Sequence, residues 1–375
     1  MNIQMVAGLL FLATFVGILL ERVDRTIIAL AGGGAMVALG MALDFYHQEE
    51  ALASVDFNTL GLLLGMMILV ALLAKTGFFQ YLATLTAQKS GGSPWRLLLI
   101  LGAITTVLSM VLDNVTTIVL IAPISILIAE ILGVSPIPFL ISGALLSNTG
   151  GVATLVGDPP NILIGSAANL SFNDFLVHLA PIVALAWVGA VLLIRYLFRE
   201  ELAQQPRDPA ALEHIDPTEA ITDRASLTKI LIVMGLVVLG FFLHTVLHLE
   251  PAFVALLGAA LALLWVQPDV EEMLKEVEWS VLLFFAALFV LVGGVEASGL
   301  LHDLAGSVTA LAEANLLLTG IVLIWGSAIM SAIVDNIPFT IVMIPIIHDL
   351  GALGLDITPL WWALALGAGF GGNGT

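Results

Sequence analysis

Two Asp-Asn pairs interrupt long apolar stretches of the chain, at Asp113-Asn114 and at Asp335-Asn336. An ionised Asp at the centre of a membrane helix costs about 2.5–3.5 kcal/mol on insertion scales, so a residue kept there normally has a use. Carboxylate and amide oxygens are hard ligands that suit Na⁺, and a buried carboxyl group can also carry a proton. The alternative is that each pair only caps a half-helix, as Asp and Asn often do. The recurrence of the pair favours ion binding.

A second candidate is the segment 147–161, which reads SNTGGVATLVGDPPN. Two successive prolines remove two amide donors and clash with preceding carbonyl groups, so a continuous helix cannot pass. The unwound backbone must be satisfied by protein, water or a ligand. Asp158 is either a ligand or only a turn residue, because Gly-Asp-Pro-Pro is ordinary turn chemistry.

The elements that carry these residues are predicted to be membrane helices. Of 375 residues, 60% are hydrophobic and 11% are charged, and the mean hydropathy is +1.09, whereas soluble domains are about 45–50% apolar and about 25% charged. The apolar runs lack the alternation of a transmembrane β-barrel. A net charge of −18 disfavours nucleic acid as a partner, and the lack of cysteine excludes disulfides and thiolate metal sites.

The apolar runs 97–133 and 315–349 are too long for one span of about 20 residues. Each is therefore expected to be a helical hairpin with an Asp-Asn pair at its tip. A shift of 222 residues superposes the two pairs, and the same shift aligns further residues, namely Gly77 with Gly299, Ser109 with Ser331 and Pro123 with Pro345. The sequence thus contains an internal repeat.

Residues 199–228 are rich in Asp, Glu, Arg and Pro and are expected to form a cytoplasmic linker. The linker separates the first repeat with its N-terminal spans, 1–198, from the second repeat, 229–375. The distribution of Lys and Arg gives the repeats opposite orientations. The predicted fold class is therefore an all-α polytopic membrane protein with two inverted-topology repeats, helical hairpins and interrupted transmembrane helices. Such repeats should bring the two tips together near the bilayer midplane.

Support for an enzyme is weaker. Neither a Walker A motif nor a dinucleotide fingerprint is present, and no nucleophile–base pair stands out. His244 and His248 are spaced i and i+4, but without a third ligand they are interpreted as interfacial residues at a span end. A metal-dependent membrane hydrolase that uses Asp113, Asp158 and Asp335 is the least favoured alternative.

With these motifs the chain resembles the ion transporter superfamily of ArsB arsenite permeases, NhaD sodium/proton antiporters, citrate and dicarboxylate carriers and the melanosomal P protein. The segments that carry the resemblance are LDNVTTIVLIAP at 112–123, GGVATLVGDPPN at 150–161, VDNIPFTIVMIP at 334–345 and GGNGT at 371–375. The Gly-Asp-Pro-Pro-Asn form resembles the ArsB and P-protein branch. The resemblance implies a secondary active transporter that forms a homodimer. Each subunit would have a scaffold part and a transport part, and the transport part would move by an elevator mechanism.

In the carboxylate carriers of this superfamily the tips read Ser-Asn-Thr and hold sodium and the substrate carboxylate. Here Asp replaces that Ser in both tips, which disfavours a dicarboxylate and favours coupling to a cation or proton. The resemblance therefore implies alternating-access transport of an inorganic ion or oxyacid (arsenite, antimonite or Na⁺), coupled to H⁺ or Na⁺. A citrate or dicarboxylate:cation carrier is the alternative.

No cofactor is expected beyond the coupling ion. The protein is expected to be a multi-pass protein of the inner or plasma membrane. Na⁺ is expected at the two Asp-Asn pairs. The residues expected to bind substrate or ions are Asp113, Asn114, Thr117, Asp335, Asn336, Thr340, Asn148, Gly150, Gly151, Asp158, Asn161, Gly372 and Asn373.

The first repeat continues from Thr154 to about Phe198, whereas the second stops at Thr375 soon after its own glycine-rich break. Because the superfamily has a final span after this break, the resemblance implies a C-terminally incomplete chain.

We expect a cysteine introduced at Ala210 to be labelled from the cytoplasmic side only, because the basic residues from Arg195 to Lys229 resist translocation. An impermeant maleimide applied to intact cells and to inverted vesicles measures this without background, since the chain has no other cysteine. Labelling of intact cells from outside would contradict the assignment.

Overall fold

The computed structural model describes residues 2–204, 216–306 and 315–374, without the side chain of Val334. All regular elements in these residues are helices, and seven of them are long and apolar enough to cross a membrane. The predicted all-α polytopic membrane fold is confirmed. Residues 205–215 of the predicted linker, which include Ala210, lie outside the described residues, as does Thr375 of the last motif.

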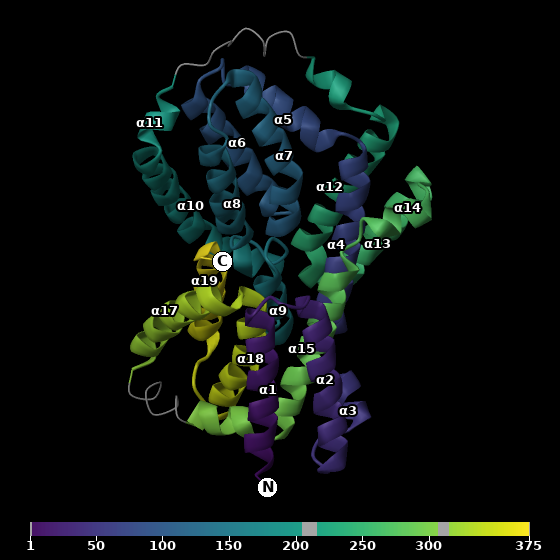
Figure 1. Ribbon diagram of the computed structural model, residues 1–375. Helices are drawn as coiled ribbons and strands as arrows, with labels where there is room; N and C mark the ends of the chain where they lie inside the picture. The colour runs from purple at the N-terminus through teal and green to yellow at the C-terminus, as the bar shows by residue number, and fades with distance from the viewer. Residues whose placement is uncertain (1, 205–215, 307–314, 375) are drawn as a thin grey trace. The chain divides into compact units, whose positions relative to one another are not determined.

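The helices group into two compact units, unit 1 (1–64, 162–170 and 278–375) and unit 2 (65–161 and 171–277). Unit 1 contains α1 (Ile3–Leu19), α2 (Arg25–Ala42), α3 (Gln48–Ala53), α15 (Trp279–Ala297), α17 (Leu316–Val334), α18 (Asn336–Ala352), α19 (Thr358–Gly371) and η3 (Gly372–Gly374). Unit 2 contains α5 (Phe78–Lys89), α6 (Pro94–Ser109), α7 (Asn114–Leu132), α8 (Ile137–Gly151), α10 (Phe172–Leu197), α11 (Arg199–Leu202), η2 (Pro217–Ala220), α12 (Arg224–Leu247), α13 (Pro251–Val266) and α14 (Val270–Lys275). Two helices, α4 (Phe57–Lys75) and α9 (Pro159–Ala168), belong partly to each unit (Figure 1).

The internal repeat is visible in the register of the helices. The helices α4, α6 and α7 have counterparts that begin 222 residues later, since their first residues Phe57, Pro94 and Asn114 correspond to Trp279, Leu316 and Asn336. Gly77 and Gly299, which follow α4 and α15, have φ angles of +80° and +81°. A turn that requires glycine thus recurs at the same place in both halves. The inverted orientation of the repeats and their boundaries at 198 and 229 stay predictions.

Both predicted hairpins are present, but their tips differ. The helices α6 and α7 are joined by residues 110–113, whereas α17 and α18 are joined by Asp335 alone. Asp335 makes this sharp connection with a φ of +94°, which residues other than glycine rarely adopt. The hairpins therefore repeat in sequence and helix register, while the geometry of the tips does not.

The predicted helix break is also confirmed. The helix α8 ends at Gly151, residues 152–158 are not helical, and α9 begins at Pro159. The prolines occupy the first turn of α9, where a missing amide proton costs no intrahelical hydrogen bond.

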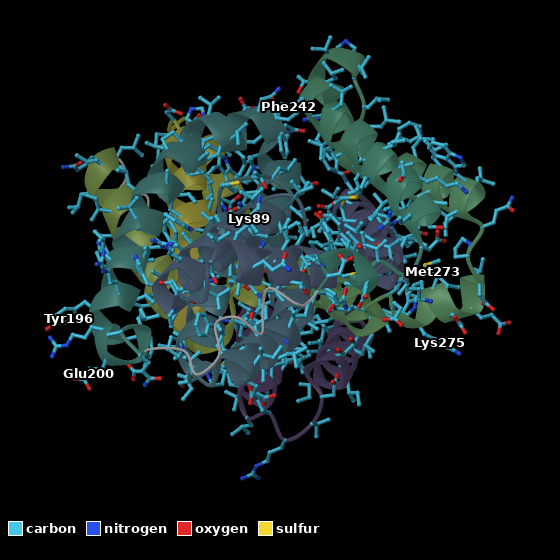
Figure 2. The ribbon with its side chains drawn as sticks, turned by 90° about the horizontal axis from the view of Figure 1, so that it is seen from above. Lys89, Tyr196, Glu200, Phe242, Met273 and Lys275 are labelled. Atoms are coloured by element: carbon cyan, nitrogen blue, oxygen red, sulfur yellow. The ribbon has the colours of Figure 1, made fainter. Side chains whose placement is uncertain are left out.

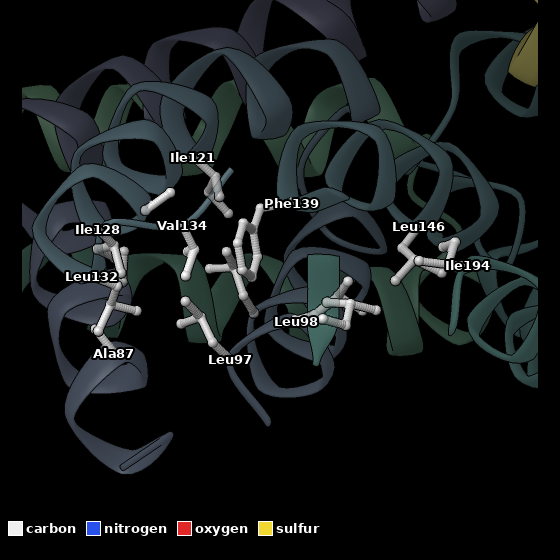
Figure 3. Close-up of a cluster of buried hydrophobic side chains, with 14 of the residues drawn as sticks. Ala87, Leu97, Leu98, Ile121, Ile128, Leu132, Val134, Phe139, Leu146 and Ile194 are labelled. Carbon is white, nitrogen blue, oxygen red and sulfur yellow. The ribbon is translucent and has the colours of Figure 1, made fainter. Parts of the chain in front are cut away.

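A cluster of buried side chains joins the first hairpin to α8 and α10 within unit 2. Leu97, Leu98, Ile121 and Phe139 are each at most 3% exposed at its centre (Figure 3). On the outer faces of the long helices, large apolar side chains such as Phe242 of α12 stay exposed (Figure 2). Exposed apolar faces on helices of this length suit a lipid solvent.

The described end of the linker packs against the end of α4 in unit 2. The backbone amide of Thr222 donates to the Thr76 carbonyl at 3.0 Å, and its Oγ1 donates to the Lys75 carbonyl at 2.9 Å. Thr222 and the Lys75 end of α4 thus lie on the same side of this unit. The cytoplasmic location of the linker stays a prediction.

Glycines of α19 pack closely against α17 in unit 1, and the two helices lie side by side (Figure 1). A Cβ atom on Gly367 or on Gly371 would come within 2.5 Å of the carbonyl oxygen of Ile324 or of Ala328. Small residues four positions apart allow membrane helices to approach in this way. The glycines of α19 therefore fix its distance from the second hairpin.

We expect Gly367→Ala to lower the free energy of unfolding by about 1–3 kcal/mol, because the added methyl group meets a backbone carbonyl. The matched control is Gly320→Ala in α17, where a Cβ would meet no atom within 4 Å and alanine favours the helix. Thermal unfolding of both purified variants in detergent measures the difference. Equal melting temperatures would contradict the close approach.

Candidate functional site

The first tip and the helix break meet in unit 2. The Asn114 side-chain nitrogen donates to Asn148 Oδ1 at 2.7 Å and to Asp158 Oδ1 at 3.4 Å. These residues stand at the start of α7, in the last turn of α8 and just before α9. Three of the residues that the sequence singled out are thus in direct contact, although 34 and 44 positions separate them.

Hydroxyl groups join the first tip to the break after α8 by hydrogen bonds. Ser109 Oγ donates to the Ser147 carbonyl at 2.7 Å, and Ser147 Oγ donates to the Asn114 carbonyl at 2.9 Å. Thr154 Oγ1 donates to the Met110 carbonyl. The bonding role of Ser109 was not predicted, although a serine beside a hairpin tip in an apolar run indicates a hydrogen bond to a neighbouring backbone.

Asn161 satisfies the unwound backbone. Its side-chain nitrogen donates to the carbonyl oxygens of Gly151, Val152 and Thr154 at 3.4, 3.0 and 2.8 Å. The side chain is fully buried. The unwound backbone was expected to pair with protein, water or a ligand. These three carbonyl groups pair with protein, through the side chain of Asn161.

Two buried oxygens of this cluster accept no hydrogen bond from the described residues, Asn114 Oδ1 and Asn161 Oδ1. Buried polar atoms in native proteins are nearly always paired, so each such atom needs a water, an ion or a substrate group. Asp158 is itself fully buried beside them. The cluster at the first tip is therefore an assembly of carboxylate, amide and hydroxyl oxygens that fits a small cation.

Asp113 caps α7. Its Oδ1 accepts a hydrogen bond from the Thr116 amide at 2.7 Å, and Thr117 Oγ1 donates to the Asp113 carbonyl at 2.8 Å. The capping interpretation is thus confirmed for this residue. Capping does not exclude ion binding, because a carboxylate has about four lone-pair positions, and the ion-binding role stays a prediction.

The second tip, in unit 1, is held differently. The Asp335 side chain makes no capping hydrogen bond to α18 and instead pairs with Arg25, whose Nη1 lies 2.9 Å from its Oδ2. This ion pair joins residues 310 positions apart and was not predicted from the sequence. Asn336 and Thr340 are buried, and Thr340 Oγ1 donates to the Asn336 carbonyl at 2.7 Å.

The second break repeats one contact of the first. Ser331 Oγ donates to the Ala368 carbonyl at 2.7 Å, as Ser109 does to Ser147. The helix α19 ends beside Gly372, and Asn373 Oδ1 is buried and accepts no hydrogen bond from the described residues. Because Asp113 and Asp335 belong to different units, the predicted approach of the two tips stays a prediction.

The two remaining glycines of the predicted site have steric roles in unit 2. A Cβ on Gly150 would lie 2.6 Å from the Thr106 carbonyl oxygen, and one on Gly151 would lie 2.4 Å from that of Gly157. These glycines therefore allow α8 to approach α6 and the break to fold back on itself.

His244 is buried in unit 2, in the last turn of α12. Its predicted place at the membrane interface stays a prediction. The Phe172 amide donates to its Nε2 at 3.3 Å, and its Nδ1 lies 3.1 Å from the Leu249 carbonyl oxygen. Both ring nitrogens are thus engaged by backbone groups, which gives this histidine a structural role. Within the described ranges, no three His, Asp or Glu side chains are grouped as a metal site.

Comparison with known proteins identifies the family. The model of the citrate transporter family matches residues 15–367. A 46 kDa membrane protein of Mycobacterium leprae is 42% identical over 375 residues, which cover 99% of this chain and 87% of that protein. An uncharacterized transporter of Mycobacterium tuberculosis is 40% identical over 376 residues, with the same coverage of 99% and 87%.

The P protein of Sus scrofa is 34% identical over 454 residues, which cover 99% of this chain and 53% of that protein. The resemblance seen in the sequence motifs, including the likeness to P protein, is thereby confirmed. The match to transporters over nearly the whole length rules against the hydrolase alternative. The chain belongs to the citrate transporter family and is a multi-pass membrane transporter.

Proposed function

We propose that this transporter is driven by a cation that binds at the first tip, among Asp113, Asn114, Asn148, Asp158 and Asn161. The observation that carries the proposal is the buried cluster in which Asn114 bridges Asn148 and Asp158 while two amide oxygens accept no hydrogen bond from the described residues. Carboxylate and amide oxygens at this density suit Na⁺, and a buried carboxyl group suits a proton.

The charge of the cluster bears on the cargo. Asp113 and Asp158 add negative charge where a dicarboxylate would place its own, and like charges in a buried site repel strongly. A small inorganic ion or a neutral oxyacid meets no such barrier. Arsenite or antimonite would bind as neutral hydroxides through oxygen and amide groups, because the chain has no cysteine.

The remaining parts of the proposal follow from the superfamily resemblance. Transport proceeds by alternating access, with Na⁺ or H⁺ as the coupling ion and no further cofactor. The protein works as a homodimer in the inner or plasma membrane.

Carriage of citrate or a dicarboxylate is the second candidate. The match of the citrate transporter family model over residues 15–367 favours it. A coupling cation at Asp113 and Asp158 would then have to offset the charge of the substrate before it binds.

Uptake into proteoliposomes separates the candidates. We expect accumulation of arsenite, antimonite or ²²Na⁺ that depends on an imposed Na⁺ or proton gradient and ceases when an ionophore dissipates that gradient. Radiolabelled citrate and succinate form the second arm. Gradient-driven citrate uptake without transport of the inorganic ions would replace the first candidate by the second, and transport independent of both gradients would contradict cation coupling.

We expect Asp113→Asn to abolish coupled transport while changing the free energy of unfolding by no more than about 0.5 kcal/mol, since Asn and Asp are similar helix caps. The substitution removes only the charge that would bind Na⁺ or exchange a proton. Uptake in proteoliposomes and thermal unfolding in detergent measure the two effects.

The matched control is Asp223→Asn. Asp223 caps α12 by accepting hydrogen bonds from the Ala225 and Ser226 amides, and hydrogen bonds from Ser226 hold its pKa below the ordinary value. The same charge is thus removed from the same kind of cap outside the cluster, and transport should be unchanged. If the Asp113→Asn variant transported at the wild-type rate, Asp113 would be only a helix cap and would have no role in cation binding.

A further inference from the structure

Asp335 pairs with an arginine from another helix. Arg25 Nη1 lies 2.9 Å from Asp335 Oδ2, and the two side chains are 50% and 27% exposed. Asp335 makes no capping hydrogen bond to α18, whereas Asp113 caps α7. Of the two carboxylates that the repeat makes equivalent in sequence, Asp113 is thus a helix cap and Asp335 is the partner of an arginine.

The second half of the chain has no counterpart of this arginine. Arg25 is the first residue of α2, and the helix that takes the place of α2 in the second half is α13. It begins at Pro251 and contains no Lys, Arg or His. The guanidinium at the second tip is thus a departure from the internal symmetry, which indicates a task specific to Asp335.

The Arg25 side chain also has an anchor that does not depend on Asp335. Its guanidinium carbon lies 5.2 Å from the centroid of the Phe284 ring on α15, and Phe284 is buried. This distance is within the range of a cation–π interaction. If the carboxylate were taken by another cation, the guanidinium would keep this contact and its exposure to solvent.

The ion pair borders a polar cavity of about 630 Å³ in unit 1. Its charged lining residues are Glu21, Arg22, Asp24, Arg25 and Asp335. Asp24 is committed to α2, since its Oδ1 accepts a hydrogen bond from the Thr26 amide at 2.8 Å. The cavity gives water and small ions access to the Asp335 carboxylate.

We propose that Arg25 is an internal counter-cation, which the transported or coupling cation displaces from Asp335. The inference rests on the proposed cation-coupled function and deepens it, because it assigns a competitor to the second tip. A partly exposed ion pair is weak enough to exchange one cation for another. The strained backbone of Asp335, with φ +94°, persists only when its surroundings hold it, so exchange of the partner also releases a constraint on the tip.

The test measures the half-saturating Na⁺ concentration of transport at constant pH, with a proton titration at constant Na⁺ as the second arm. We expect Arg25→Gln to lower the half-saturating concentration of the cation by about two- to fivefold, the size expected when a partly exposed ion pair no longer competes. Arg22→Gln is the matched control. It removes the same charge from the same cavity, while Arg25 remains paired with Asp335, and should leave this concentration unchanged.

Other roles of Arg25 give other results. If Arg25 only stabilised the fold, Arg25→Gln would lower the melting temperature and leave the cation concentration unchanged. If it bound an anionic substrate, the half-saturating substrate concentration would rise instead. If Arg22→Gln lowered the half-saturating cation concentration equally, the overall electrostatic potential of the cavity, and not the Arg25–Asp335 pair, would determine that concentration. Each of these results would overturn the proposal.

A second measurement uses the unsubstituted protein and so does not depend on whether a variant folds. Phenylglyoxal modifies free guanidinium groups, and peptide mass spectrometry follows Arg25 and Arg22 separately. We expect Na⁺, or a lower pH if protons are the coupling ion, to raise the rate of modification of Arg25 relative to that of Arg22. An unchanged ratio of the two rates under conditions where the cation drives transport would refute displacement. Wild-type transport that needs neither cation would instead refute the proposed function itself.

Discussion

The structure depends on one constraint, that every backbone polar group at membrane depth must find a partner inside the protein. The non-helical residues 152–158 lack the backbone hydrogen bonds of a helix, and the Asn161 side chain replaces some of them by donating to three carbonyl groups. Close folding of the break then requires glycine, since a Cβ on Gly157 would lie 2.5 Å from the Ser109 carbonyl oxygen. The same folding brings Asp158 to Asn114. The polar cluster is thus a consequence of how the broken helix is paired.

The two halves share the framework but not the polar groups. In both, a serine at the end of the first hairpin arm donates to the helix before the break, Ser109 to Ser147 and Ser331 to Ala368. Asn148, which accepts from Asn114, is replaced by Gly369 at the corresponding place in the second half. The second tip lacks this amide and is compensated by Arg25. Repetition of the helices therefore coexists with two chemically different tips.

The sequence predicted the features that depend on short segments of the chain. Hydropathy and run length gave the membrane helices and both hairpins, and the Pro-Pro pair gave the break before α9. The contact of Arg25 with Asp335 could not be predicted in this way, because a single ion pair over 310 positions leaves no periodic signal. The burial of His244 was missed for a related reason. Its partners are the backbone groups of Phe172 and Leu249, and backbone partners have no sequence signature.

Both tips contain a carboxylate whose charge is already partly compensated. Asp113 faces the first turn of α7, where unpaired amide groups amount to about half a positive charge, and Asp335 faces a guanidinium. Partial compensation reduces the cost of keeping Asp within a membrane protein. It also weakens the attraction for any further cation, because that cation must share the carboxylate with the helix end or with Arg25. Partial compensation therefore favours reversible cation binding, which the proposed cation-driven transport needs because the ion must be released in every cycle.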